Sequence, residues 1–406
     1  MKVLHIALSD GGGAGIGMMN QHRALLDMGV DSRVLVAVKK TDCPTVTLAQ
    51  PNQYVWSTNR YLLLIEKIAR RFGICFNRYD RIHHSIYKVR KRHNVPFSSP
   101  VTQYDLSRHP LVEWADVINL HYVSGFVDMA TFFGNVGKPI VWTMRDENPG
   151  LGGFHYEESR RQYYKYYTTL EDEFLAIKRK AIQSCESLSL VSLSAMMRDF
   201  CKKVDFLANR RNTIIHNAID PSGYTAVNKD EARRALGLSS DDTILSFVCC
   251  QLDERRKRLA ETIEAIGILG DEHIKLVCVG NGDTTPHAPN IITLGTISDT
   301  QRLSLVYSAS DAFVSPSAQE SFGKTIVEAL YCGTPVVSTP VGIAAEIIDE
   351  SNGTLCGGTP REIAKAIGEV LARQHNRQAI RDKAVGMFAP ANIARQYIEL
   401  YKLATS

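Results

Sequence analysis

The chain has 406 residues, of which 44% are hydrophobic and 22% are charged, and its formal net charge is +4. This composition is ordinary for a globular protein and excludes a fibrous, low-complexity or largely disordered chain. The length allows two domains, each with a core of its own. A nucleic-acid-binding protein of this size would usually be more basic or would carry one dense basic stripe, so the charge balance argues against that class.

Strand-like and helical patterns alternate along the first half. The first stretch, MKVLHIALSDGGG, lacks the apolar length and the cleavage site of a signal peptide and is typical of a β-strand. Apolar strand patterns occur at residues 2–9, 31–38, 115–123 and 138–144, and a helical pattern at residues 18–29. This alternation predicts a parallel sheet with crossover helices.

A second series of the same kind begins after residue 214. Strand patterns occur at residues 243–250, 273–280, 290–295, 311–317 and 334–340, separated by helical patterns such as residues 258–270. Residues 210–224 are polar and rich in turn formers, which predicts a linker. We therefore predict two Rossmann-like parallel-sheet domains, residues 1–212 and 213–384, with a C-terminal helix in residues 385–406 that packs back on the first domain.

Membrane and redox features are weak, with one exception. No run approaches the roughly 18 apolar residues of a membrane-spanning helix. The nine cysteines are scattered and form no C-x-x-C pair, which indicates reduced thiols in a cytoplasmic protein and no metal site. Residues 60–92 carry many Lys and Arg residues against only Glu66 and Asp80. Such a stretch fits an anionic membrane surface or an anionic acceptor, or else a solvated helix face.

Two loops of the second series suit a phosphate ligand. The first leaves a strand and enters a helix through Arg255, Arg256 and Lys257. Cations are unfavourable at a helix start unless an anion offsets them, so a diphosphate fits here better than a solvated helix turn. The second loop contains Gly280 and Gly282, which allow backbone to approach a ligand or simply make a tight turn.

A third loop sets two carboxylates eight residues apart. Glu320 precedes a predicted helix and Glu328 lies inside it, and eight residues at helical rise span about 12 Å. The backbone N–H groups of residues 321–324 stand at the helix start, where phosphate is favoured. Carboxylates accept hydrogen bonds from sugar hydroxyl groups, so the pair fits the two ends of a sugar nucleotide. The alternative is a helix-capping Glu320 and a solvated Glu328.

The motifs together resemble a known enzyme family. The stretch PSAQESFGKTIVEALYCGTPVVSTPVG is similar to the E-x7-E signature of family 4 glycosyltransferases, which are retaining enzymes with the GT-B fold. The stretches SDGGGAGIG, DVINLHYVSGF, KPIVWTMRD, IIHNAID, DERRK, VGNGD and YSASDAFVSPS follow in the order of that family. The resemblance covers most of the chain and is nearest to bacterial enzymes that build O-antigen, capsule or exopolysaccharide. It implies two domains that face each other across a cleft.

The resemblance also implies roles for individual residues. Glu320 would contact the donor hexose and Glu328 the donor ribose. Arg256 and Lys257 would hold the diphosphate, and His121 would lie near the reacting sugar, although a lone histidine is more often packed than catalytic. The remaining donor-binding positions implied by the match are Gly12, Gly13, Gly15, Gly280, Gly282, Ser321, Phe322, Gly323 and Lys324.

The implied reaction transfers a hexose from a UDP- or GDP-linked donor to a hydroxyl group of a glycan or lipid-linked acceptor, without a metal or cofactor. The acceptor would attack on the face that the diphosphate leaves, and the diphosphate would take its proton. The sequence departs from the family's pattern in three places. Cys250 and Gln251 stand where many relatives have Gly-Arg, and Gly342 is followed by Ile343 where a glycine pair is common. The stretches MRD and GGFHY stand for LHD and GGCHY of the nearest relatives, whose further cysteines are missing here.

Three rival functions are less well supported. An NAD-type oxidoreductase would need a G-x-G-x-x-G loop, and the stretch GGGAGIG breaks that spacing at Met18. A sugar-nucleotide epimerase or phosphorylase of the same fold stays open, and nucleotide release that requires an acceptor would exclude it. A non-catalytic sugar-binding module would have little reason to keep His121, Arg256, Lys257 and both glutamates.

Overall fold

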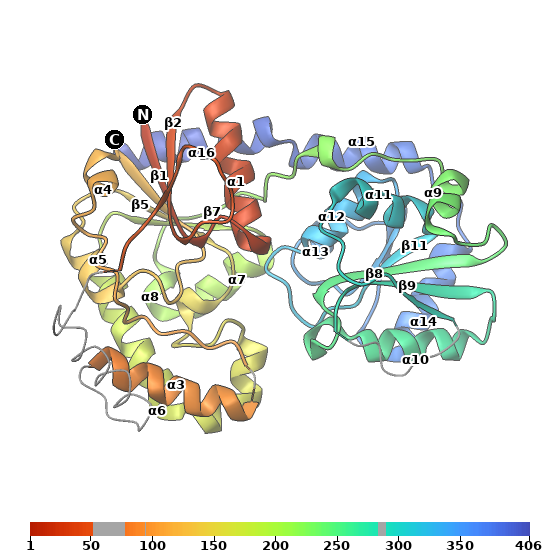
Figure 1. Cartoon of the computed structure of the whole chain (residues 1–406), viewed down its shortest axis with the longest axis horizontal. Helices are drawn as coiled ribbons and strands as arrows, with labels where there is room; N and C mark the ends of the chain where they lie inside the picture. The colour runs from red at the N-terminus through yellow and green to blue at the C-terminus, as the bar shows by residue number, and fades with distance from the viewer. Residues whose placement is uncertain (52–77, 94, 283–289) are drawn as a thin grey trace, which may run out of the picture. The chain divides into compact units, whose positions relative to one another are not determined.

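The computed structural model describes residues 1–51, 78–93, 95–282 and 290–406 (Figure 1). These residues form two compact units. Unit 1 comprises Met1–Ser192, Met197–Ile215 and Ala394–Ser406, and unit 2 comprises Leu193–Met196 and His216–Ile393. The main crossing between the units, near residue 215, falls within the stretch 210–224, and the chain returns to unit 1 inside its last helix.

Unit 1 is built on a seven-stranded sheet in the order β3-β2-β1-β4-β5-β6-β7, and every strand pair is parallel. The strands are β1 (Lys2–Ser9), β2 (Asp31–Val38), β3 (Val46–Leu48), β4 (Val117–Leu120), β5 (Ile140–Met144), β6 (Leu188–Ser192) and β7 (Asn212–Ile214). Because β2 and β4 flank β1 on opposite sides, the order of the chain reverses between β1 and β4.

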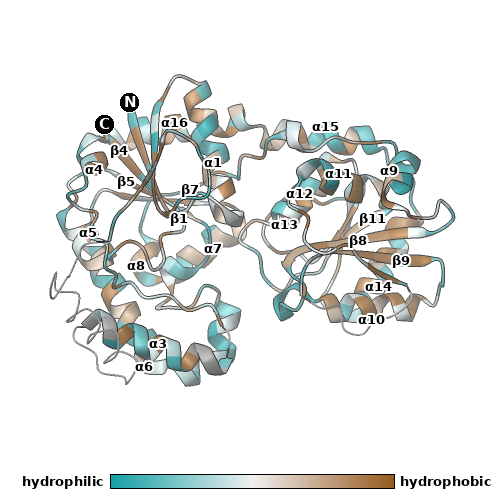
Figure 2. Cartoon of the chain, viewed as in Figure 1, coloured by the Kyte–Doolittle hydropathy of each residue, from teal (hydrophilic) through white to brown (hydrophobic). Residues whose placement is uncertain are grey.

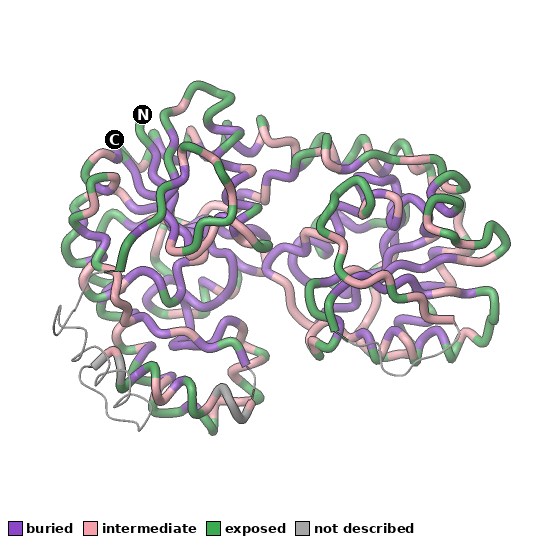
Figure 3. Tube along the Cα trace, viewed as in Figure 1, coloured by how far each residue is buried: buried purple, intermediate pink, exposed green. Residues whose placement is uncertain are grey.

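The strands of unit 1 are apolar because helices cover both faces of the sheet. In β1, Leu4 and Ile6 belong to one core cluster, whereas Ala7 belongs to the cluster on the other face with Met18 and Val36. Figure 2 shows the strands as hydrophobic, and Figure 3 shows them buried. Each fully buried Leu, Ile or Val side chain contributes about 1.5–3 kcal/mol to folding.

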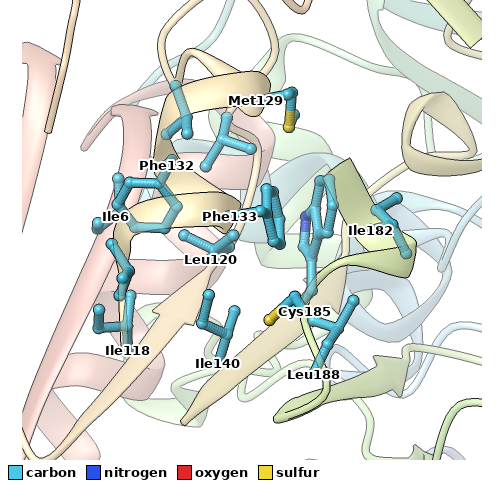
Figure 4. Packing of buried hydrophobic residues seen from close by; sticks show 14 of the residues in the cluster. Ile6, Ile118, Leu120, Met129, Phe132, Phe133, Ile140, Ile182, Cys185 and Leu188 are labelled. Atoms are coloured by element: carbon cyan, nitrogen blue, oxygen red, sulfur yellow. The ribbon is translucent and has the colours of Figure 1, made fainter. Parts of the chain in front are cut away.

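The larger cluster fills the space between the sheet and two helices. Figure 4 shows Phe132 and Phe133 of α5 (Met129–Asn135) packed over Ile118, Leu120 and Ile140. Ile182 and Cys185, at the end of α6 (Glu157–Gln183), close the other side of this cluster. The remaining helices of unit 1 are α1 (Gly12–Asp27), α3 (Arg78–His93), α4 (Pro110–Trp114), η1 (Asn148–Gly150), α7 (Ala195–Lys203), α8 (Asp205–Ala208) and most of α16 (Pro390–Thr405).

The helix α3 is amphipathic. Ile82 and Ile86, four residues apart, are buried in a small cluster with Phe97, Phe154 and Phe174. This cluster joins α3 to α6 and to the irregular segment that follows β5.

Unit 2 contains a six-stranded parallel sheet in the order β10-β9-β8-β11-β12-β13. Its strands are β8 (Thr243–Gln251), β9 (Ile274–Asn281), β10 (Ile291–Thr293), β11 (Ala312–Ser315), β12 (Val336–Ser338) and β13 (Gly353–Leu355). The order again reverses beside the first strand, here between β8 and β11. The two parallel sheets confirm the predicted fold class.

Helices cover both faces of this sheet as well. They are η2 (Pro221–Gly223), α9 (Lys229–Leu236), η3 (Arg255–Lys257), α10 (Leu259–Leu269), α11 (Thr300–Ala309), α12 (Lys324–Tyr331), α13 (Ala344–Ile347), α14 (Pro360–Leu371) and α15 (Arg377–Phe388). Figure 1 shows α10 and α14 side by side on one face, where they contact each other. The α14 helix begins with a capping box, in which Thr359 and Glu362 satisfy each other's backbone N–H groups.

Candidate functional site

Unit 2 brings the predicted cations and Glu320 to one edge of its sheet. The strands β8 and β11 are neighbours in the sheet although β9 and β10 lie between them in sequence. Where strand order reverses in this way, the loops at the carboxyl ends of the two strands form the usual ligand site of an open α/β sheet. The loop after β8 carries Arg256 and Lys257, and the loop after β11 carries Glu320.

Both cations share Glu320 as an acceptor. Oε1 of Glu320 lies 2.5 Å from Nζ of Lys257 and 3.5 Å from Nη1 of Arg256. Arg256 also donates to the carbonyl oxygen of Gln319 and lies 2.8 Å from Oε1 of Glu254. The side chains of Lys257, Arg256 and Glu320 are 18%, 14% and 13% exposed. Arg256 and Lys257 are therefore not the solvated charges of the alternative interpretation, whereas Arg255 is exposed.

The backbone holds these two loops together. The N–H group of Ala318 donates to the carbonyl oxygen of Arg256 at 2.8 Å. Arg258, which separates η3 from α10, has a φ of 59° and is the one non-glycine residue with positive φ in the described part of the chain. Its guanidinium donates to the carbonyl oxygen of Pro316. A left-handed arginine costs about 1–2 kcal/mol, so the surrounding contacts must fix this turn.

The charge of Glu320 is stabilised by its partners. Burial by itself would raise the pKa of this carboxyl group, but the Lys257 ammonium and then the Arg256 guanidinium outweigh that effect and lower the pKa from 4.5 to about 2. Glu320 is therefore ionised at neutral pH and accepts hydrogen bonds without donating any.

This pKa predicts a pH dependence of stability. Because the unfolded chain binds a proton at Glu320 at a higher pH than the folded chain, the stabilisation is complete above the unfolded pKa of 4.5 and is lost as pH falls towards 2. We expect the stability difference between wild type and Glu320→Gln to be largest above pH 4.5 and to shrink below it. Urea denaturation at a series of pH values measures this difference in the free energy of unfolding. A difference that stays constant with pH would contradict the lowered pKa of Glu320.

The start of α12 offers backbone donors beside Glu320. Gly323 is the N-cap residue, with a φ of 90°, and no side chain caps the helix. Glu320 is therefore not a capping residue, which excludes one of the alternatives. Ser321 and Phe322 are buried, and their carbonyl oxygens accept from Oγ of Ser194 and from the N–H group of Ile343. The N–H groups at the start of α12 point out of the helix end and suit an anion.

Glu328 lies deeper in the unit and is 4% exposed. Its Oε1 accepts from the hydroxyl group of Tyr224 at 2.5 Å and lies 2.6 Å from Nζ of Lys324, and its Oε2 accepts from the hydroxyl group of Tyr307 at 2.9 Å. It is not the solvated residue of the alternative interpretation. Because α12 begins at Lys324, only part of the separation between the two glutamates is helical, and the estimate of about 12 Å from helical rise does not apply.

Tyr224 and Tyr307 are site residues that the sequence did not reveal. Burial and then the charge of Glu328 raise the pKa of both hydroxyl groups, so they remain protonated and donate to the carboxylate. The available signal was that Glu328 stands among apolar helix residues, where a buried carboxylate needs donors. Nothing in the spacing identified which residues supply them.

The two predicted loop glycines differ in position, because Gly280 lies inside β9, one residue before its end, and only Gly282 follows the strand. A Cβ atom on Gly280 would lie 2.5 Å from the carbonyl oxygen of Cys249 on β8, so glycine allows the two strands to approach closely. Gly282 follows the end of β9 beside Asp253. The next residues, 283–289, lie outside the described part of the chain.

In unit 1, the predicted glycine loop lies at the corresponding edge of the sheet. Gly12, Gly13 and Gly15 open α1 directly after β1, beside the reversal of strand order. A Cβ atom on Gly15 would lie 2.5 Å from the carbonyl oxygen of Ser9, whereas Cβ atoms on Gly12 and Gly13 would meet no atom within 4 Å. Gly15 therefore serves helix packing, and the space beside the other two glycines is open.

Two alanine substitutions separate these roles. We expect Gly15→Ala to lower the free energy of unfolding by about 1–3 kcal/mol, because the added methyl group overlaps the β1 backbone. The matched control Gly13→Ala should be neutral or slightly stabilising, because alanine favours a helix and has room there. Urea denaturation of both variants tests this contrast, and equal losses of stability would contradict it.

The predicted His121 follows β4 on the same edge of unit 1 and is buried. Its Nδ1 accepts from Nη2 of Arg145 at 3.0 Å, so its Nε2 carries the hydrogen and donates to Nδ1 of His5 at 2.9 Å. Burial, and then the charge of Arg145, lower the pKa of His121 well below the usual histidine range. The ring is therefore neutral, and a contact with a reacting sugar would require one of these hydrogen bonds to open.

The MRD and GGFHY stretches form a buried polar cluster beside β5. Nδ1 of His155 lies 2.6 Å from Oδ2 of Asp146. The carboxylate of Glu171 accepts hydrogen bonds from the N–H groups of Gly152 and Gly153. Nζ of Lys178, which is fully buried, donates to three oxygens of this segment, and burial lowers its pKa to about 7. Protein contacts thus hold this segment together.

Three further observations concern the described residues alone. They include no group of His, Cys, Asp and Glu side chains that could hold a metal ion. No helix among them is both long enough and apolar enough to cross a membrane. All eight cysteines in this part of the chain are free.

The match to a family model lies in unit 2. Residues 243–373 match the family model described as glycosyl transferases group 1. The chain is 27% identical over 244 residues to an uncharacterized glycosyltransferase of Methanocaldococcus jannaschii, covering 55% of this chain and 62% of that protein. It is 33% identical over 181 residues to the D-inositol 3-phosphate glycosyltransferase of Mycobacteroides abscessus, covering 40% of each chain. The matches thus span less than two thirds of these relatives.

Solved structures match the whole chain at low identity. Sucrose-phosphate synthase from Thermosynechococcus elongatus has a TM-score of 0.66 at 17% identity and covers 99% of this chain and 98% of its own. HepE of Anabaena, solved with UDP and glucose, has a TM-score of 0.67 at 17% identity and 99% coverage of both chains. The glycosyltransferase WaaG has a TM-score of 0.61 at 20% identity, with 99% of this chain and 97% of that chain covered. The shared architecture is the GT-B fold.

Proposed function

We propose that this chain, a GT-B protein whose residues 243–373 match the model of the glycosyl transferases group 1 family, transfers a sugar from a nucleoside-diphosphate sugar to a hydroxyl group of an acceptor. The observation that carries the proposal is the cluster of Arg256, Lys257 and Glu320 between the loops of β8 and β11. It combines two partly buried cations, a carboxylate and a helix start at one sheet edge, and all lie within the residues that match the family.

The proposed chemistry is stabilisation of a leaving diphosphate. As the bond from sugar to phosphate breaks, negative charge grows on the diphosphate, and preorganised positive groups lower the barrier. Arg256, Lys257 and the first N–H groups of α12 supply such groups, so we expect no metal or cofactor. Glu320 would bind hydroxyl groups of the sugar as a carboxylate. We infer that neither glutamate becomes glycosylated and that the acceptor attacks on the face the diphosphate leaves, with retention of configuration.

We propose that Glu328 binds the ribose hydroxyl groups, as in family 4 glycosyltransferases. Among its three donors, Tyr224 and Tyr307 are buried, whereas Lys324 is 30% exposed. A ribose hydroxyl group would take the place of Nζ of Lys324 at the carboxylate. The ammonium would then be available to the neighbouring diphosphate, to which it adds a further positive charge.

For the substrates, we propose a UDP- or GDP-linked hexose and a glycan or lipid-linked acceptor in surface polysaccharide synthesis. The structures of HepE with UDP and with UDP-glucose support a uridine donor. WaaG, which is described as involved in lipopolysaccharide biosynthesis, supports the role in polysaccharide synthesis. The D-inositol 3-phosphate glycosyltransferases among the relatives are a reason to include a phosphorylated cyclitol among the acceptors tested.

The experiment is a two-stage assay on the purified chain. Nucleotide sugars are first screened for a rise in melting temperature, because a donor that binds only the folded state stabilises it. The best donor is then incubated with and without a panel of acceptors while nucleotide release is measured. Acceptor-dependent release supports a transferase. Conversion of the donor without an acceptor would indicate an epimerase or a hydrolase. Nucleotide release that requires inorganic phosphate would indicate a phosphorylase, and donor binding without nucleotide release would indicate a sugar-binding module.

We also propose that the basic stretch brings the protein to the inner face of an anionic membrane. Residues 60–77 of this stretch lie outside the described residues. In the described part, α3 turns Ile82 and Ile86 inward and exposes Arg81, Tyr87 and Lys88. Basic residues near an anionic surface contribute about 1 kcal/mol each to binding.

A vesicle assay tests this surface. We expect the double variant Arg81→Glu and Lys88→Glu to co-sediment less with vesicles that contain anionic lipid than wild type does. Lys365→Glu, on unit 2, is the matched control, because its side chain is 80% exposed and lies outside the basic stretch. Unchanged co-sedimentation of the double variant would refute membrane contact through α3.

A further inference from the structure

A cavity of about 310 Å³ lies at the other edge of the unit 2 sheet. Its lining includes Thr243, Asp311 and Pro335, which stand at or just before the first residues of β8, β11 and β12. Because all strands of this sheet are parallel, these residues mark its amino-terminal edge, whereas Lys257 and Glu320 follow the carboxyl ends of the same strands. The cavity is therefore separate from the candidate donor site.

Positive side chains dominate the lining. Lys229, Arg373 and Arg377 face a single acidic residue, Asp311. That carboxylate already has strong partners outside the lining, because its Oδ2 lies 2.7 Å from Nη2 of Arg233 and accepts from the N–H group of Ile244 at 2.7 Å. Lys229, whose Nζ lies 3.0 Å from Oδ1, therefore adds a charge that Asp311 does not need for neutralisation.

Arg377 lacks an acidic partner among the described residues. Its guanidinium donates to the carbonyl oxygens of Ser308 and Ser310 and to Oγ1 of Thr334, all of which are neutral acceptors. It is also the first residue of α15, where the helix dipole opposes a positive charge. Arg377 thus brings a positive charge to the cavity without an ion pair of its own, and the Asp311 carboxylate that also lines the cavity acts on it only at longer range.

Lys229 and Arg373 retain donors for a ligand. The Lys229 ammonium has three N–H groups and one protein acceptor, Asp311. Arg373 uses Nη1 on neutral oxygens of Gly353 and Thr354, and its Nη2 stands 4.0 Å from Glu369. The two side chains are 42% and 35% exposed, so a ligand from solvent can reach them.

We propose that this cavity binds a small phosphate-bearing anion. A guanidinium group binds phosphate oxygens and an ammonium adds a point charge, and Arg373 and Lys229 provide these groups, while the protein-bonded Arg377 adds positive charge. The lining contains no Phe, Tyr or Trp side chain for a nucleobase to stack on. The ligand is therefore a phosphate or a small phosphorylated metabolite, and it would join the starts of three strands to α9, α14 and α15. This inference does not depend on the proposed transferase activity.

The test measures thermal unfolding of the full chain during titration with inorganic phosphate, against sodium chloride of the same ionic strength. All proteins carry Lys257→Ala as background, so that phosphate bound at the donor site contributes little. We expect phosphate to raise the melting temperature in this background. Adding Lys229→Gln or Arg373→Gln should weaken the apparent affinity about tenfold, because each removes a charge-assisted hydrogen bond.

Lys365→Gln is the control for general charge effects, because it removes one exposed positive charge of the same unit outside the cavity. It should leave the phosphate response unchanged. Lys229→Gln is expected to fold, since Asp311 keeps Arg233 and the Ile244 N–H group as partners. The proposal is overturned if phosphate raises the melting temperature no more than chloride does. It is also overturned if the phosphate response of Lys229→Gln equals that of the background protein and of the control Lys365→Gln.

Discussion

Replacement of Lys257 by alanine should lower the turnover number for sugar transfer by about 10²–10³-fold, which is the usual cost of removing one preorganised group from a developing negative charge. The expected loss is large because Lys257 is only 18% exposed and is held 2.5 Å from Glu320. A charge fixed beforehand in a partly desolvated site stabilises the departing diphosphate without reorganisation during the reaction.

The fold should survive this substitution. Glu320 keeps Arg256 as a neighbour, and the backbone hydrogen bond from Ala318 to Arg256 does not involve the lysine side chain. Circular dichroism and the melting temperature check folding, and initial-rate kinetics give the turnover number. Lys257→Arg should recover part of the rate, and the exposed Lys365→Ala should match wild type. A Lys257→Ala protein with a wild-type turnover number would remove the lysine from the mechanism.

The second large effect is expected at Glu328. Glu328→Ala leaves the buried hydroxyl groups of Tyr224 and Tyr307 without their acceptor, which costs about 1–3 kcal/mol for each group that stays unsatisfied. We therefore expect a loss of about 2–5 kcal/mol in the free energy of unfolding. Donor binding should weaken as well, because Glu328 is the proposed ribose ligand.

Conservative variants separate stability from binding. Tyr307→Phe removes one hydrogen bond and should cost about 1 kcal/mol, while Lys324 and Tyr224 still hold the carboxylate. Glu328→Gln keeps the shape of the side chain but loses the charge that Lys324 pairs with, so donor affinity should fall more than stability does. Urea denaturation and calorimetric titration with the donor give the two quantities. Normal donor affinity in Glu328→Gln would contradict the ribose assignment.

The sequence predicted the two sheets because their strands are buried on both faces. Runs such as residues 2–9 and 243–250 are mostly apolar and alternate with helical patterns, which favours a parallel sheet with helices on both faces. The strands β3, β6, β7 and β13 were not predicted. The three residues of β7 lie inside the polar stretch 210–224, where pattern alone gives no strand signal. Its pairing with β6 is a tertiary contact.

The sequence indicated which loops share an edge of the sheet but not which side chains contact one another there. The alternation of strands and helices predicted that the loops with Arg256, Lys257 and Glu320 lie at the carboxyl ends of the strands. The pattern did not predict that β8 lies beside β11, which brings these three residues together. Glu328 contacts Tyr224 and Tyr307, which lie far from it in the sequence, at the end of η2 and in α11. These are tertiary contacts that the local sequence pattern does not predict. The chain from Arg145 through His121 to His5 joins three separate strand regions in the same way.

The most direct test of the proposed chemistry follows one reaction by proton NMR. The purified chain is mixed with the donor it binds and an acceptor, and the anomeric signal of the new glycoside is recorded as nucleotide is released. Cleavage assisted by Arg256 and Lys257, with attack on the face the diphosphate leaves, predicts a product with the anomeric configuration of the donor and one nucleoside diphosphate per glycoside. A product of inverted configuration, or nucleotide release at the same rate without acceptor, would contradict it.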